Sequence, residues 1–165
     1  MIGFRVAHPY TTTPSITFPT LNHIVDGVYI SGAEVLNTPR LLRRAGIKHV
    51  LKLYQDEPHV PDELCVLEIP IADAQYISKA NLNRGVDFIM RQVAEGNRVL
   101  VMCAAGMSRS PAFMLAYLLE NSYDAREAYA LLTENHPETK VHSKLWASLI
   151  DHFALPYSLD EVMDF

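Results

Sequence analysis

Residues 98–111 have the sequence RVLVMCAAGMSRSP, and this stretch decides the expected fold. Residues 98–102 are the most hydrophobic of the short strand-like runs and predict a buried strand. The strand leads into Cys103, small residues follow, and Pro111 marks the start of a helix. Because ligands of open α/β sheets bind where strands end and helices begin, the connection between strand and helix is the expected functional site.

The composition of this connection is typical of an oxyanion site. The residues after Cys103 lack bulky polar side chains, so consecutive backbone N–H groups can line a concave nest; they are Ala104, Ala105, Gly106, Met107 and Ser108. Arg109 adds a planar guanidinium that can bind two phosphate oxygens. A helix N-terminus and an arginine also favour the nucleophilic thiolate form of a cysteine, and Ser110 is placed to donate a hydrogen bond to the sulfur. We therefore predict that Cys103 attacks a phosphate that this loop binds.

The rest of the chain alternates strand-like and helix-like segments. Strands are predicted at residues 25–30, with a turn at Asp26-Gly27, and at residues 48–54 and 64–71, both consistent with buried strands. Helix signals occur at Thr38 as N-cap with a stop at Gly46, at Ser78 with a stop at Gly96, and near Pro111, Asp124 and His142. This order implies an α/β domain in which helices flank a central, largely parallel sheet.

The bulk composition narrows the possible partners. The 165 residues, 49% of them hydrophobic, suit one domain with a sizeable core. A net charge of −5 argues against nucleic acid as a partner, and no apolar run approaches the ~20 residues that span a bilayer, so we expect no membrane partner. The N-terminus lacks an apolar signal core. Two cysteines are too few for a disulfide scaffold, so we expect a reducing compartment, the cytoplasm. The histidines are scattered along the chain, so we expect no metal site and no other cofactor.

The sequence CAAGMSRS at residues 103–110 matches the C-x-A-G-x-S-R-S phosphate loop of dual-specificity protein phosphatases. The chain resembles that family from about Ile24 to Phe153, including GVYISG at residues 27–32. The resemblance implies a protein-tyrosine-phosphatase-like fold, with Cys103 as nucleophile, Arg109 as phosphate ligand and Ser110 as hydroxyl residue. We expect residues 1–20 to be an extended arm, 21–155 the catalytic domain, and 156–165 an acidic tail with a few apolar anchors.

The reaction also needs a general acid, because the leaving oxygen of a phosphate ester departs poorly unless it is protonated. In the family that the chain resembles, this acid is an Asp roughly thirty positions before the cysteine. Asp73 lies in the loop after strand 64–71, thirty residues before Cys103. The resemblance therefore implies Asp73 as acid and then base, in preference to Asp56 and Asp62, which precede that strand.

Two positions depart from the family pattern. Met102 stands where most relatives carry the histidine thought to order the loop, so we expect a slower enzyme but not an inactive one. Residues 138–142, ETKVH, replace a common Pro-Asn before the last helix. Cys65 is interpreted as a buried core residue, with a disulfide to Cys103 as the less favoured alternative.

Three functions remain open from the sequence. The first is a phosphomonoesterase that acts on phosphoproteins or aryl phosphates and is inhibited by phosphate-like oxyanions. The second is a phosphate-binding pseudophosphatase, an interaction module with little turnover. The third is a sulfurtransferase of the rhodanese kind, which would not require Asp73 or the Arg-Ser-Pro ending of the loop. Loop side chains without charge, together with the acidic chain, disfavour inositol lipids and RNA 5′ ends as substrates.

Overall fold

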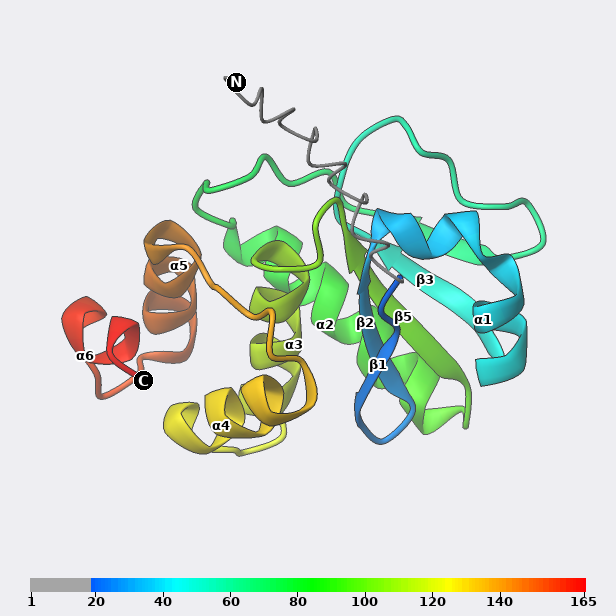
Figure 1. The fold of residues 1–165 in the computed structure, drawn as a ribbon. Coiled ribbons are helices and arrows are strands. Elements are labelled where there is room, and N and C mark those ends of the chain that lie inside the picture. Colours follow the sequence, from blue (N-terminus) through cyan, green and yellow to red (C-terminus); the bar gives the residue numbers. More distant parts are fainter. Residues whose placement is uncertain (1–18) are drawn as a thin grey trace, which may run out of the picture.

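The computed structural model describes residues 19–165, so the predicted arm at residues 1–20 lies almost wholly outside the described residues. Five strands form one sheet in the order β1-β2-β5-β3-β4 (Figure 1). Their bounds are Asn22–Val25 (β1), Val28–Gly32 (β2), Ile47–Lys52 (β3), Cys65–Glu68 (β4) and Arg98–Cys103 (β5). β1 pairs with β2 in antiparallel fashion, and the other three pairings are parallel, which confirms the largely parallel sheet.

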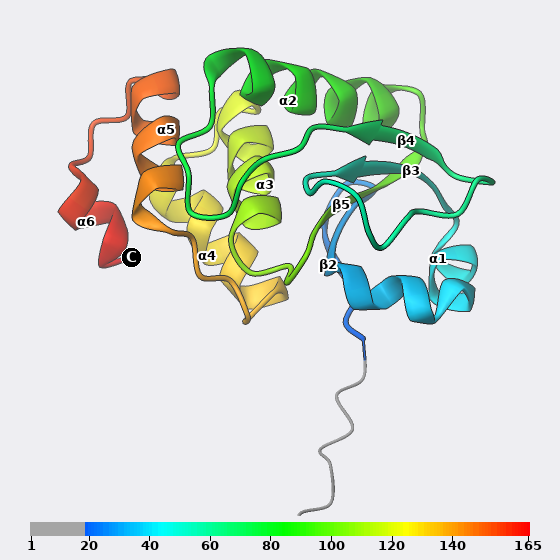
Figure 2. The same ribbon diagram turned by 90° about the horizontal axis from the view of Figure 1, so that it is seen from above.

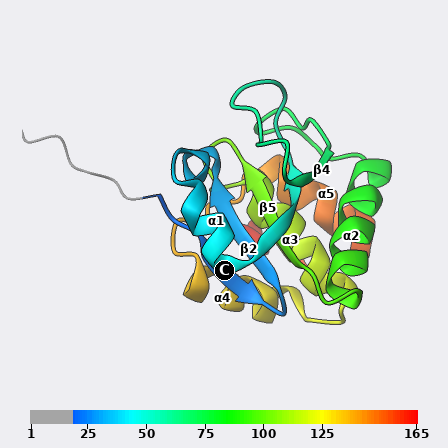
Figure 3. The same cartoon turned by 90° about the vertical axis from the view of Figure 1, so that its right-hand side faces the viewer.

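Helices cover both faces of this sheet. The 3-10 helix η1 (Ala33–Asn37) and helix α1 (Pro39–Ala45) lie on one face. The other face carries α2 (Lys79–Ala94), α3 (Arg109–Glu120), α4 (Ala125–Asn135) and α5 (Ser143–Phe153), with α6 (Leu159–Met163) packed on α5. Figures 2 and 3 show the sheet between these two layers, with α1 and α3 on opposite sides.

The alternation of side chains along β5 assigns each residue to one layer. Val99, Val101 and Cys103 belong to the core shared with α2–α5, whereas Leu100 and Met102 belong to the core beneath α1. Met102 is fully buried in that second core. The cysteine and the residue before it therefore point to opposite faces of the sheet.

The predicted helix signals are confirmed, although one N-cap residue acts without a side-chain hydrogen bond. The Ser78 side chain accepts a hydrogen bond from Asn81 N–H, and Asp124 caps α4 in the same way. Gly46 ends α1 in the left-handed conformation with φ of 71°. Thr38 stands at the N-cap of α1, but its side chain forms no capping hydrogen bond. The start of α1 is therefore marked by Pro39 at the first helical position, because proline has no N–H that would need a partner there.

The prediction that strand 64–71 is buried, with Cys65 in the core, is wrong. β4 extends only over Cys65–Glu68, and Cys65 is exposed. β4 is the last strand of the sheet, so one of its edges has no neighbouring strand. The apolar residues of β4 resemble those of a central strand, and only the order of strands in the sheet shows that β4 is an edge strand.

Residues 156–165 fold back onto the domain through an aromatic cluster of Tyr129, Trp146, Tyr157 and Phe165. Neighbouring rings of this cluster lie 5.2–6.1 Å apart between centroids. The guanidinium of Arg126 lies 4.3 Å from the Phe165 ring centroid, a cation–π contact. The segment expected as an acidic tail thus contains α6, while the domain boundary at residue 155 stays a prediction. None of the helices within residues 19–165 combines the length and hydrophobicity that crossing a bilayer demands.

Candidate active site

Cys103 ends the central strand of the sheet. β5 lies between β2 and β3, and Cys103 is in register with Gly32 of β2. The Cys103 side chain is buried, and its Sγ accepts hydrogen bonds from Gly106 N–H at 3.2 Å and from the Ser110 hydroxyl at 2.9 Å. The sulfur therefore lies between a loop amide and the first turn of α3, where donors stabilise a thiolate.

Three carbonyl groups of the loop accept hydrogen bonds from outside it. The pairs are Ala104 O with Ala33 N at 2.9 Å, Gly106 O with His136 Nε2 at 2.6 Å, and Met107 O with Lys140 N at 2.7 Å. In a planar trans peptide the next N–H points away from the C=O. The N–H groups that follow therefore face the concave side of the loop; they belong to Ala105, Met107 and Ser108. An anion-binding nest requires this arrangement.

Gly106 is required by the close approach of the loop to β2. Its φ is 72°, in the left-handed region, and a Cβ at this position would lie 2.5 Å from Gly32 N. A side chain at residue 106 would therefore be strained and would also collide with backbone that cannot move aside.

Arg109 connects the phosphate loop to the loop that contains Asp73. It is the first residue of α3 and is 9% exposed, and its Nη1 donates to Ile71 O at 2.8 Å. Arg109 Nε is buried and has no hydrogen-bond partner among residues 19–165; it lies 3.8 Å from Asp73 Oδ1. Asp73 itself is 71% exposed at its side chain and accepts a hydrogen bond from Ala74 N–H.

These residues border one cavity of about 450 Å³. Its lining includes Asp73, Cys103, Ala105, Met107, Ser108 and Arg109, whereas Ala104, Gly106 and Ser110 do not line it. Residues 140–143 and Met163 of α6 also line the cavity, and Lys140 lies directly beside the loop through its hydrogen bond to Met107 O. Sequence reasoning singled out residues 138–142 only as a departure from the family pattern, and it missed Met163 and His136, because no motif links these two positions to the loop. Within the part of the chain that the structure describes, no group of three or more His, Cys, Asp or Glu side chains is arranged to bind a metal ion.

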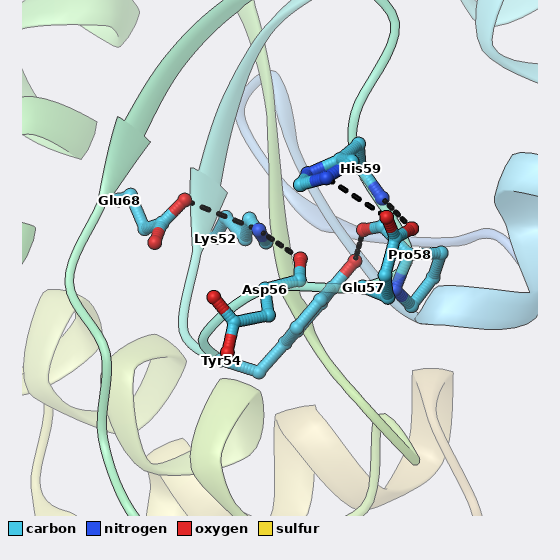
Figure 4. A network of polar contacts seen from close by, with 7 residues as sticks. All are labelled: Lys52, Tyr54, Asp56, Glu57, Pro58, His59 and Glu68. Carbon is cyan, nitrogen blue, oxygen red and sulfur yellow. Dashed lines mark hydrogen bonds and ion pairs between the residues drawn. The ribbon is translucent and has the colours of Figure 1, made fainter.

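A buried lysine organises the loop after β3, next to Met102. Lys52 is in register with Met102 and is 2% exposed. Its Nζ donates to Asp56 O at 2.7 Å and to Glu68 Oε2 at 3.1 Å (Figure 4). Burial, and after it the negative charges of Glu68 and Glu57, raises the pKa of Tyr54 to about 12. Tyr54 therefore stays a protonated donor near the site.

Cys65 lies too far from Cys103 for a disulfide. Register places Cys65 of β4 level with His49 of β3 and Val99 of β5, four residues before Cys103. That offset is about 13 Å along the strand, and β3 lies between the two strands. A disulfide needs Cα atoms within about 7 Å, so the sheet separates the two thiols, and both are free.

A family profile described as "Dual specificity phosphatase, catalytic domain" matches residues 28–154. The chain belongs to this family. Dual specificity protein phosphatase 12 from Homo sapiens is 34% identical over 165 residues, which cover 96% of this chain and 48% of that protein. The Mus musculus protein of the same name is 32% identical over 157 residues, which cover 91% of this chain and 46% of that protein. This member of the dual-specificity phosphatase family thus spans about half the length of the curated relatives it matches.

Solved structures of the family share the fold. A mouse protein described as a dual specificity phosphatase, complexed with zinc tungstate, superimposes with a TM-score of 0.77 at 22% identity, over 90% of this chain and 99% of that chain. Human DUSP28 superimposes with a TM-score of 0.76 at 20% identity, over 84% of this chain and 95% of that chain. The protein-tyrosine-phosphatase-like fold implied by the loop sequence is therefore confirmed.

Proposed function

We propose that the chain is a phosphomonoester hydrolase of the dual-specificity protein phosphatase type, acting through a cysteinyl-phosphate intermediate without a metal or other cofactor. One observation carries the proposal: Cys103 Sγ accepts hydrogen bonds from Gly106 N–H and the Ser110 hydroxyl and borders the same cavity as Arg109 and Asp73. Donors favour the thiolate, and the cavity gives a phosphate access to it.

In the first step the Cys103 thiolate attacks phosphorus, and an S–P bond forms as the P–O bond to the leaving group breaks. The electron pair of that bond goes to the leaving oxygen, and the carboxylic acid of Asp73 supplies its proton. The exposed position of Asp73 at the cavity edge suits a group that exchanges protons with solvent.

In the second step water attacks phosphorus, and the Asp73 carboxylate takes its proton. The S–P bond breaks and Cys103 leaves as thiolate, stabilised by the Ser110 hydroxyl at 2.9 Å. The sum of both steps is ester plus water giving alcohol plus phosphate. The inward N–H groups and Arg109 Nε, which is buried without a partner among residues 19–165, would bind the equatorial oxygens through both transition states.

The favoured substrates are phosphorylated proteins and aryl phosphates. Cavity-lining loop residues Ala105 and Met107 carry no charge, whereas a polyanionic inositol lipid or RNA end would favour several cations. The tungstate bound to the mouse relative is a phosphate-like oxyanion, which supports inhibition of this chain by such ions. A mechanism based on a free thiolate suits a reducing compartment such as the cytoplasm.

Hydrolysis of para-nitrophenyl phosphate in EDTA with reductant, with and without vanadate, tests the proposal. We expect vanadate-sensitive turnover in the wild type and none in Cys103→Ser. Cys65→Ser is the matched control, because Cys65 is an exposed cysteine on the edge strand, and it should retain wild-type turnover. A folded wild type that binds tungstate but does not turn over would contradict the proposal and favour the phosphate-binding module. Cyanide-dependent thiocyanate formation would instead identify a sulfurtransferase.

A further inference from the structure

His136 contacts the phosphate loop through its side chain. It follows α4 as its C-cap, is 1% exposed, and lies 30 residues beyond Gly106. Its Nε2 is 2.6 Å from Gly106 O. A carbonyl oxygen only accepts hydrogen bonds, so Nε2 must carry the hydrogen. In the neutral ring Nδ1 then accepts from Asn22 Nδ2 at 2.7 Å, and Glu138 Oε2 lies 3.5 Å from the same nitrogen.

We infer that His136 is a positioning residue that orders the phosphate loop, a task that Met102 does not perform. The inference deepens the proposed function and rests on it. Met102 is fully buried on the opposite side of the sheet and does not border the cavity. His136 reaches the loop from the same side as α3 and α4, through a polar atom.

The peptide unit between Gly106 and Met107 is the part of the loop that most needs an external partner. Glycine adopts positive and negative φ with similar ease, so Gly106 does not by itself restrict this unit to one orientation. The hydrogen bond from His136 directs Gly106 O outward, and by planarity Met107 N–H then faces the cavity. Gly106 N–H, on the other side of the same residue, donates to Cys103 Sγ. The hydrogen bond from His136 therefore orients Met107 N–H toward the oxyanion and also holds Gly106 N–H in place to donate to Cys103 Sγ.

The other two outward carbonyls are bound differently. Ala104 O accepts from the backbone of Ala33, and Met107 O accepts from the backbone of Lys140. A substitution cannot delete either backbone N–H except by proline. Among the donors to these three carbonyl groups, only His136 donates from a side chain. A substitution at residue 136 can therefore remove this hydrogen bond without changing the backbone.

The test compares His136→Leu, His136→Asn and His136→Gln. Glutamine can place Nε2 near the position of the imidazole Nε2, whereas the asparagine amide is too short to reach Gly106 O and leucine has no donor. We expect kcat/KM to fall about tenfold in His136→Leu and His136→Asn, below the ~100-fold that follows the outright loss of an oxyanion donor. Affinity for inorganic tungstate, measured by calorimetry, should fall in parallel. His136→Gln should recover most of both quantities.

Thr139→Val is the matched control. Thr139 donates its hydroxyl to His136 O in the same turn but does not contact the loop, so kcat/KM and tungstate affinity should stay within about twofold of wild type. Folded His136→Leu or His136→Asn with wild-type tungstate affinity would overturn the inference, as would a glutamine variant as weak as the leucine variant. Failure of the proposed function can be distinguished from failure of this inference. If the wild type shows no turnover, its tungstate affinity can still be compared with that of the His136 variants, and this comparison alone tests whether His136 orders the loop.

Discussion

The two loops that meet at the cavity differ in how they are supported. Three carbonyl groups of the phosphate loop and the Ser108 hydroxyl accept hydrogen bonds from distant segments, and the cysteine of the loop is 2% exposed. The loop that contains Asp73 has its carboxylate 71% exposed, and the Asp73–Arg109 separation of 3.8 Å exceeds hydrogen-bonding distance. The half of the site that we propose to bind the anion is thus preorganised, whereas the half that we propose to donate the proton lies in solvent and is linked to it mainly through Arg109 and Ile71 O.

This contrast suggests a division of work. Preorganised donors stabilise transition-state charge without rearranging during the reaction. A general acid and base must instead gain and lose a proton in each cycle, which solvent contact permits. Changes in the first loop should therefore affect oxyanion affinity and turnover together, and changes in the second should affect turnover alone.

The largest effect is expected from Gly106→Ala. The added Cβ would meet Gly32 N at 2.5 Å, and the φ of 72° is strained for alanine, so the loop must open. We expect kcat/KM and tungstate affinity to fall together, with kcat/KM lower by about 100-fold or more. Gly96→Ala is the matched control: its φ is 76°, but a Cβ there meets nothing within 4 Å. It should lower the melting temperature and leave turnover unchanged. Equal loss of activity in both variants would mean that backbone strain, and not the approach to β2, is responsible.

Asp73→Asn should come next and should act on turnover only. The amide cannot supply the proton, so kcat should fall about 100-fold, within the usual range for a lost general acid. Tungstate affinity and melting temperature should not change, because the side chain is mostly exposed. Asp62→Asn, at one of the two alternative aspartates that precede β4, is the control and should retain kcat, because Asp62 is exposed and does not line the cavity. A loss of tungstate affinity in Asp73→Asn would show that the two loops are not independent.

The smallest effect is expected from Tyr76→Phe, which releases the second loop from α5. The Tyr76 hydroxyl donates to Asp151 Oδ2 at 2.8 Å, and this bond raises the pKa of Tyr76 above its usual 10.0, so the tether persists at assay pH. We expect kcat to fall about twofold at constant tungstate affinity, in keeping with one modest exposed hydrogen bond. Tyr157→Phe removes a similar bond to Asp124 outside this loop, and its kcat should match the wild type. An unchanged kcat in Tyr76→Phe would mean that the tether does not position Asp73.

The features that could be predicted from the sequence are those that local spacing determines. Cys103, Ser108, Arg109 and Ser110 all lie within residues 103–110, so their placement at one loop follows from a single short segment. The helix that begins after Ser78 was equally visible, because its cap and apolar face repeat within one element. Catalytic roles at these positions stay predictions until the variants are measured.

The features that could not be predicted depend on which segments meet. His136 reaches Gly106 only because α4 ends beside the phosphate loop, and Met163 borders the cavity only because α6 returns along α5. The exposure of Cys65 likewise follows from the edge position of β4, since strand order is a tertiary property. No local pattern encodes these neighbours, so a residue that is distant in the sequence can complete a site without a motif of its own.

The aromatic cluster offers a built-in optical probe. Trp146 is the single tryptophan of the chain, it is 2% exposed, and the Phe165 ring meets it edge-on at 5.8 Å. Tryptophan fluorescence, excited at a wavelength that tyrosine does not absorb, therefore originates at one known place in this protein, beside the segment that carries α6. A red shift on detachment of that segment could be followed without any label, in the same cuvette as the turnover assay. Emission and absorbance would then distinguish loosening of the C-terminal helix from disordering of the loop around the sulfur.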